Sequence, residues 1–157
     1  MPLARKVSES EVRETIRRYA VGVEYDGSHF HGWQSQSGVT TVQDLLESAL
    51  SSVAAEPVRV VTAGRTDTGV HASGQVAHFD TEAERTTLNW VRGANTNLPG
   101  GVALTWAKEV DRGFHARFSA LSRKYRYILF CRDVRPTYLA KRVSWTYECL
   151  DVQRMRA

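Results

Sequence analysis

The sequence predicts an α+β fold of the ferredoxin-like type, in which an antiparallel sheet carries its helices on one face and leaves the other face open. The main observation is the order of its segments, β-α-β-β-α-β-β, which matches a split βαβ plan resembling RNA-recognition domains. The second is length, because 157 residues fit one compact domain with a core of its own. The open face is a candidate platform for RNA.

The chain begins with a charged segment, residues 1–18, which we treat as an N-terminal extension of the domain formed by residues 19–157. Ser8, with Glu11 three positions later, forms a possible capping box and predicts a short helix to about residue 18. The segment mixes acidic with basic residues and lacks an apolar core, so it predicts neither a secretory signal nor a transit peptide. A cytoplasmic protein is therefore expected.

A strand and a helix open the domain. Residues 19–25 alternate in hydrophobicity and then reach a turn at Asp26-Gly27, which predicts a strand entering a loop. Apolar residues at helical spacing then form one stripe along residues 42–53. Thr41 can cap the helix that this stripe predicts.

Two further strands and a second helix follow. Residues 57–63 are rich in β-branched side chains and residues 74–80 form a second strand-like run, with a glycine-rich connection between them. Thr87 can cap a helix that runs to about residue 97, where a Leu-Pro-Gly sequence ends it.

Two more strands are expected over residues 101–110 and 122–130, separated by a basic connection. Asp151 can cap a last helix, but the chain stops at Ala157 after barely one turn, which indicates a shortened chain. The two cysteines, Cys131 and Cys149, have no CxxC partner, so we expect reduced thiols rather than a metal site or a disulfide.

The net charge of +4 is unevenly distributed along the chain. Residues 1–111 hold ten Lys and Arg against fourteen Asp and Glu, whereas residues 112–142 hold nine Lys and Arg against one acid. Aromatic residues are interleaved with these cations, a pattern that suits a nucleic-acid backbone with bases available for stacking. A solvated basic face, on a strand whose aromatic side chains enter the core, agrees with the charge pattern equally well.

The stretch AGRTDTGVHASGQVAHFD, residues 63–80, places Arg65 and Asp67 on a loop between two predicted strands. In an extended segment residues two apart share a face, so both side chains can enter one cleft, where the arginine would keep the carboxylate ionised. An Arg–Asp pair that only pins a turn is the alternative. We expect no metal site with the nearby histidines, because His71 can bond within the loop and His78 lies on a strand.

Five stretches occur in a single order, and together they resemble the N-terminal half of the TruA family of tRNA pseudouridine synthases: VEYDGSHFHGWQSQ, VQDLLESAL, AGRTDTGVHASGQVAHFD, ANTNLPG and FHARFSALSRKYRYIL. The resemblance covers residues 19–157 and implies isomerisation of uridine to pseudouridine in the tRNA anticodon stem-loop, at positions 38, 39 and 40. It also implies a homodimer that uses no cofactor and no metal. Members of the family are longer, so we expect the C-terminal half to be absent here.

The resemblance also assigns roles to individual residues. Asp67 matches the catalytic aspartate, which acts as a nucleophile or as a base, and Arg65 matches a residue that helps to extrude the target base. Tyr125 matches a tyrosine that stacks on the target uracil, although a core tyrosine is the alternative from its strand pattern alone. Contacts with RNA phosphates are expected from five residues: His115, Arg117, Arg123, Lys124 and Arg126. A catalytically inactive RNA-binding or assembly fragment is the alternative function.

Overall fold

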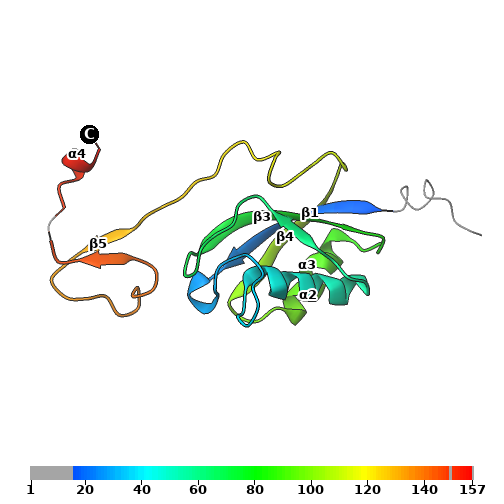
Figure 1. The fold of residues 1–157 in the computed structure, drawn as a ribbon, viewed down its shortest axis with the longest axis horizontal. Helices are drawn as coiled ribbons and strands as arrows, with labels where there is room; N and C mark the ends of the chain where they lie inside the picture. The colour runs from blue at the N-terminus through cyan, green and yellow to red at the C-terminus, as the bar shows by residue number, and fades with distance from the viewer. Residues whose placement is uncertain (1–15, 149, 157) are drawn as a thin grey trace, which may run out of the picture. The chain divides into compact units, whose positions relative to one another are not determined.

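The computed structural model describes residues 16–148 and 150–156, which divide into two compact units, residues 16–121 and residues 122–156. The first unit contains a four-stranded sheet and two long helices, and the second contains a two-stranded sheet. Figure 1 shows the elements of each unit. Each unit is therefore considered by itself.

The first unit has the predicted ferredoxin-like fold. Its sheet has the order β2-β3-β1-β4, and all neighbouring strands are antiparallel. Helices α2 and α3 lie on one face of this sheet (Figure 1). The bounds are Arg17–Tyr25 for β1, Val42–Ala54 for α2, Val60–Thr62 for β2, Ala72–Thr81 for β3, Thr87–Asn97 for α3 and Val102–Val110 for β4.

Both helices begin at a threonine cap. The side chain of Thr41 accepts a hydrogen bond from the Asp44 N–H at the start of α2, as predicted. The cap of α3 is Thr86 rather than the predicted Thr87, because Thr86 has an extended backbone and accepts from the Asn89 N–H, whereas Thr87 is already helical. Most of the predicted apolar stripe of α2 is buried, and Leu45 and Val53 are partly buried against the same core.

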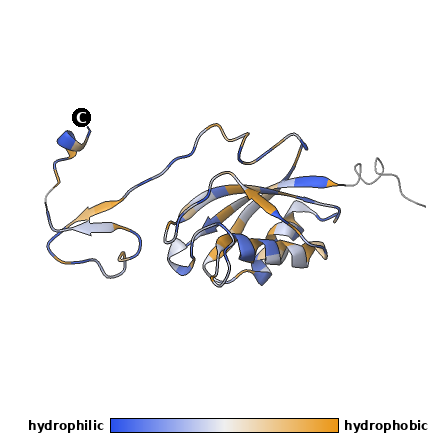
Figure 2. Cartoon of the chain, in the orientation of Figure 1, coloured by the Kyte–Doolittle hydropathy of each residue, from blue (hydrophilic) through white to orange (hydrophobic). Residues whose placement is uncertain are grey.

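The core lies between the sheet and the two helices, and aromatic rings fill its centre. Tyr19, Phe79 and Trp90 form a cluster with ring centroids 5.0–5.6 Å apart. Leu46 and Leu50 of α2 are fully buried in the same core. Figure 2 shows hydrophobic residues along the strands and on the helices that cover them. Burial of this apolar surface is the main force that holds the unit together.

Some boundaries differ from the predictions. Strand β1 begins at Arg17, so the helix predicted to continue to about residue 18 is wrong at its end; Ser8 and Glu11 lie outside the described residues. The strand predicted over residues 57–63 is confirmed only for Val60–Thr62.

In the second unit, β5 (Leu129–Cys131) pairs in parallel with β6 (Ser144–Thr146), which was not predicted. The strand predicted over residues 122–130 is therefore wrong for residues 122–128. Every residue from 122 to 129 is exposed, so no apolar face fixes an extended conformation there. The predicted cap at Asp151 is confirmed, because its side chain accepts from the Gln153 and Arg154 N–H groups at the start of α4 (Val152–Met155).

The second unit also contains Cys131, which is an exposed free cysteine. Cys149 lies outside the described residues. Across both units, none of the helices in the described ranges is long and apolar enough to cross a membrane.

Candidate active-site loop and basic segment

Asp67 lies on the loop of residues 63–71, which joins β2 to β3. Arg65 and Asp67 are both exposed, whereas Thr66 between them is half-buried, with its hydroxyl oxygen 2.8 Å from the Tyr25 hydroxyl. This alternation leaves the arginine and the carboxylate facing solvent. Within the described part of the chain no ion pair joins Arg65 to Asp67, so the alternative of a pair that pins the turn is not observed.

The backbone of this loop is fixed by hydrogen bonds on both sides of Asp67. The Trp33 N–H donates to the Thr66 carbonyl oxygen over 2.9 Å, and the Val70 N–H donates to the Asp67 carbonyl oxygen over 3.1 Å. Nearer to β2, the Gln75 side-chain amide donates to the Gly64 carbonyl oxygen over 2.6 Å. The exposed carboxylate therefore belongs to a loop whose backbone is held in place by hydrogen bonds.

The loop that follows β1 packs closely against the Asp67 loop, and two glycines allow it. A Cβ atom on Gly32 would lie 2.8 Å from the Thr66 carbonyl oxygen, and Gly32 has a φ of +82°, which favours glycine. A Cβ atom on Gly27 would lie 2.1 Å from the Val70 carbonyl oxygen. The sequence predicted only a turn at Asp26-Gly27, and the packing of this loop against the Asp67 loop was missed. The second glycine, just before Trp33, is the sequence feature that could have indicated it.

His71 joins the same two loops. Its Nδ1 atom lies 3.1 Å from a carboxylate oxygen of Asp26. His78, by contrast, lies on β3, as predicted. Among residues 16–148 and 150–156, no group of three or more His, Cys, Asp or Glu side chains could hold a metal ion.

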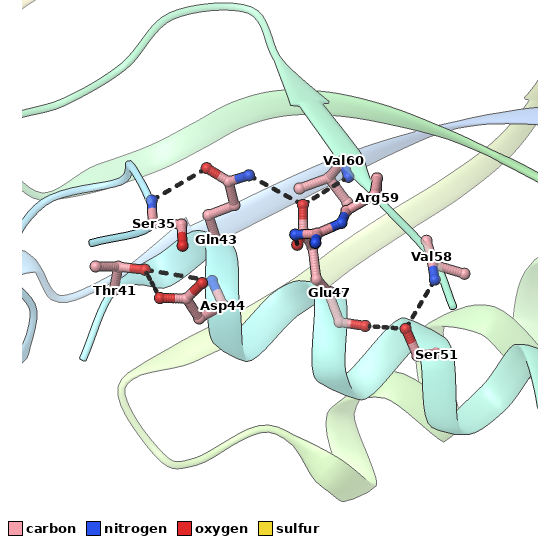
Figure 3. Close-up of polar contacts among 9 residues, drawn as sticks. All are labelled: Ser35, Thr41, Gln43, Asp44, Glu47, Ser51, Val58, Arg59 and Val60. Carbon is pink, nitrogen blue, oxygen red and sulfur yellow. Dashed lines mark hydrogen bonds and ion pairs between the residues drawn. The ribbon is translucent and has the colours of Figure 1, made fainter. Parts of the chain in front are cut away.

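Strand β2, from which the loop departs, is fixed to α2 by Glu47. One carboxylate oxygen of this buried residue accepts from the Val60 N–H over 3.0 Å, and the other accepts from the Arg59 guanidinium over 2.8 Å (Figure 3). Ser51, one turn later, accepts from the Val58 N–H over 2.9 Å. The sequence reading missed Glu47, although a carboxylate beside the apolar stripe of a helix is a signal for such a contact.

A basic segment, residues 112–118, contains two of the predicted RNA-binding residues, His115 and Arg117. His115 is half-buried and Arg117 is exposed. The segment is bonded to Arg18 and His78, and each of these residues is followed along its strand by an aromatic residue of the core. By strand alternation these two side chains are on the face opposite the helices, so the face that was expected to be free is covered in part.

Burial and hydrogen bonding on this face shift two pKa values. Burial, followed by the nearby charges of Arg18 and His115, lowers the pKa of His78 below its ordinary value of 6.5. The hydrogen bonds that Arg18 donates lower the pKa of Asp80, which accepts them at 2.6 and 2.7 Å. The imidazole is therefore neutral and the carboxylate ionised near neutral pH.

The other predicted site residues lie in the second unit. Arg123, Lys124, Tyr125 and Arg126 precede β5, and all four are exposed. The side chain of Tyr125 is 71% exposed, so it is not a core tyrosine of this unit. Asp67 and Arg65 thus share one loop of the first unit, while the association of Tyr125 with them stays a prediction.

Comparison with known proteins agrees with the resemblance noted in the sequence. A family described as tRNA pseudouridine synthase matches residues 22–119, which include the Asp67 loop and the basic segment. Proteins named tRNA pseudouridine synthase A are similar over most of this chain. The one from Coxiella burnetii is 55% identical over 142 residues, which are 90% of this chain and 54% of the relative.

Two further relatives of the same name give similar values. The protein from Pseudomonas aeruginosa is 54% identical over 90% of this chain and 50% of its own length, and that from Nitrosococcus oceani is 58% identical over 88% and 54%. The chain thus spans about half the length of the curated relatives that it matches. Because the family match extends over more than half of its residues, the chain belongs to the tRNA pseudouridine synthase family.

Proposed function

We propose that residues 19–157 form the catalytic N-terminal half of an enzyme that isomerises uridine to pseudouridine in the tRNA anticodon stem-loop, at positions 38, 39 and 40. The observation that carries this proposal is the family match over residues 22–119, which contains the loop on which Asp67 is exposed. The relatives named tRNA pseudouridine synthase A support the same reaction, with identities of 53–58%.

The proposed reaction conserves all atoms of the nucleoside. The bond between N1 and C1′ breaks, the uracil turns while still bound, C5 joins C1′, and a proton leaves C5 while N1 gains one. Asp67 starts this sequence as a nucleophile or as a base. Its exposure supports the role, because a carboxylate that acts on a nucleotide taken out of the stack has to be accessible to it.

Other exposed residues are assigned to binding the RNA. In this proposal Arg65 helps to extrude the target base, and Tyr125 stacks on the uracil and assists removal of the C5 proton. The five basic residues named above contact phosphates, although Arg126 could instead support the aspartate. The complete enzyme is proposed to be a cytoplasmic homodimer that needs neither a metal nor another cofactor.

A second candidate function is RNA binding or assembly without catalysis. The observation that favours it is length, since the chain spans 50–54% of the relatives compared above. Residues that complete a substrate pocket in those relatives can lie in the part that has no counterpart here.

One assay separates the two functions. The 157-residue chain is incubated with an unmodified tRNA transcript, and pseudouridine is measured together with binding of the same transcript. We expect Asp67→Asn to bind tRNA like the unaltered chain but to form product at least about 100-fold more slowly, since it loses the reacting carboxylate. Glu82→Gln, which alters another exposed carboxylate, is the matched control.

The outcomes are distinct. Turnover by the unaltered chain that is lost in Asp67→Asn supports the isomerase, and near-normal turnover by Asp67→Asn contradicts the role of this carboxylate. Binding without turnover by the unaltered chain supports the second function instead.

A further inference from the structure

The basic segment, residues 112–118, is fixed to the open face of the sheet by two side chains that have no role in the proposed reaction. Both come from strands that lie far from the segment in the sequence, Arg18 from β1 and His78 from β3. Both side chains lie on the outer face of the sheet and make hydrogen bonds to the backbone of this one segment. This arrangement suggests that they fix the conformation of the segment.

Arg18 holds the start of the segment. Its Nη1 atom donates to the carbonyl oxygens of Arg112 and Phe114, each over 2.8 Å. Its Nε and Nη2 atoms donate to the two carboxylate oxygens of Asp80 over 2.6 and 2.7 Å, which fixes the guanidinium in one orientation. The segment is therefore bonded to a group that is itself immobilised.

His78 holds the middle of the segment. Its Nδ1 atom accepts a hydrogen bond from the Ala116 N–H over 3.1 Å, and only 3% of the residue is exposed. The rings of Phe114 and His115 pack against its imidazole, with centroid distances of 6.1 and 4.8 Å. The acceptor has to be an unprotonated nitrogen, so the neutral imidazole is the form that binds the segment.

The anchored segment presents an exposed aromatic ring and a cation at its far end. Phe118 is 77% exposed and stacks on His115, with ring centroids 4.3 Å apart and planes 27° from parallel. The guanidinium of Arg117 lies 5.8 Å from the centre of the same ring. An exposed ring beside a cation suits an unpaired base and its phosphate.

We propose that Arg18 and His78 are positioning residues that hold residues 112–118 in one conformation, so that Phe118 and Arg117 meet an unpaired nucleotide of the RNA substrate. This proposal rests on the proposed function, because it takes tRNA as the ligand. Its physical basis is preorganisation: a segment already ordered by its hydrogen bonds does not have to be ordered when the RNA binds.

The test measures binding of an unmodified tRNA transcript to the 157-residue chain at several salt concentrations. His78→Phe keeps a ring but loses the acceptor, and we expect it to weaken binding about tenfold. The dependence of affinity on salt should become shallower by about one phosphate contact, as Arg117 is no longer held. His78→Asn, whose side-chain oxygen can accept from the Ala116 N–H, should retain most of the affinity.

Amide hydrogen exchange at Ala116 reports the contact directly and should become faster in His78→Phe but not in His78→Asn. Equal binding by folded His78→Phe and by the unaltered chain would overturn the inference, as would equal weakening by both variants. If His78→Phe does not fold, Phe118→Ala decides, because this exposed side chain is outside the core. Full affinity of Phe118→Ala would then reject the inference.

These results are separate from the test of the proposed function. Turnover that survives Asp67→Asn contradicts the catalytic proposal and leaves the binding results in place. Failure of the unaltered chain to bind the transcript rejects the role of Arg18 and His78, whatever the effect of Asp67→Asn on product formation.

Discussion

The two units of the chain differ in how their residues are held. In residues 16–121 a sheet and two helices enclose a continuous core, which contains every buried hydrophobic side chain among the described residues except Ala20, Ala116 and Pro136. In residues 122–156 the described residues include one buried position, Pro136, and two three-residue strands. The first unit thus has the internal support of a domain, and the second has little of it.

This difference matters for the proposed site, because its parts divide between the units. Asp67 and Arg65 lie on a loop that is tied to its neighbours at several points, and the basic segment is bonded to the same sheet. Tyr125 and its basic neighbours lie in the unit that lacks a core of its own. The proposal therefore assigns the carboxylate to a unit with a core of its own and the stacking ring to a unit with little internal support.

The largest expected effect comes from removing the buried tryptophan of the first unit, and the exposed tryptophan of the second unit is its comparison. Trp90 is fully buried, and its Nε1 atom lacks a hydrogen-bond partner in the described structure, so its contribution is packing. Trp90→Ala should lower the free energy of unfolding by about 3–5 kcal/mol. Trp145 is 41% exposed, and Trp145→Ala should cost at most about 1 kcal/mol.

Chemical denaturation followed by circular dichroism measures both variants. Equal destabilisation by Trp145→Ala and Trp90→Ala would contradict the proposed difference between the units. It would mean that the second unit has a core, although its side chains are exposed in the structure.

A smaller effect is expected at the support of the Asp67 loop. Glu47→Ala leaves the buried Val60 N–H without its acceptor and should lower the free energy of unfolding by about 1–3 kcal/mol. Glu84 is the matched control, because it pairs with Arg17 at the surface, where 80% of its side chain is exposed. Glu84→Ala should change stability by less than about 0.5 kcal/mol, and equal effects of the two variants would mean that Glu47 does not hold β2.

Local patterns explain why much of the first unit could be predicted. The alternating apolar side chains of residues 19–25 and most of the apolar stripe of residues 42–53 enter the core, so short stretches of sequence were enough to predict these elements. The loop bearing Asp67 was placed correctly because strands on both sides of it carry that same signal.

The parts that could not be predicted depend on distant partners. Residues 122–128 alternate like a strand, but a strand also needs a neighbour and an apolar surface, and their own unit offers neither to these exposed side chains. The contacts of Arg18 with Phe114 and of His78 with Ala116 join residues 96 and 38 positions apart. No spacing rule links such residues, so these contacts are evident only in the folded chain.

The smallest expected effect is a dependence of stability on pH that originates on the open face of the first unit. Because the pKa of His78 is lowered in the folded state, the unfolded chain takes up a proton there more readily than the folded one. The contribution of the neutral imidazole is fully present above pH 6.5, and it falls as the pH drops from 6.5 towards the lowered pKa of the folded state. The groups whose charges act on this ring are Arg18, His115 and Asp80.

Denaturation curves at several pH values between 7.5 and 5 would measure this effect, with His78→Asn as the reference that cannot titrate. The unaltered chain should lose stability on acidification, and His78→Asn should lose less, since the other histidines are common to both proteins. The contribution of Asp80 to stability stays constant over this range and is lost only at lower pH, because its own lowered pKa keeps the carboxylate ionised and bonded to Arg18. Equal pH dependence of the two proteins would show that the hydrogen bond from Ala116 does not favour the neutral imidazole, and the anchoring of the basic segment would then depend on Arg18 alone.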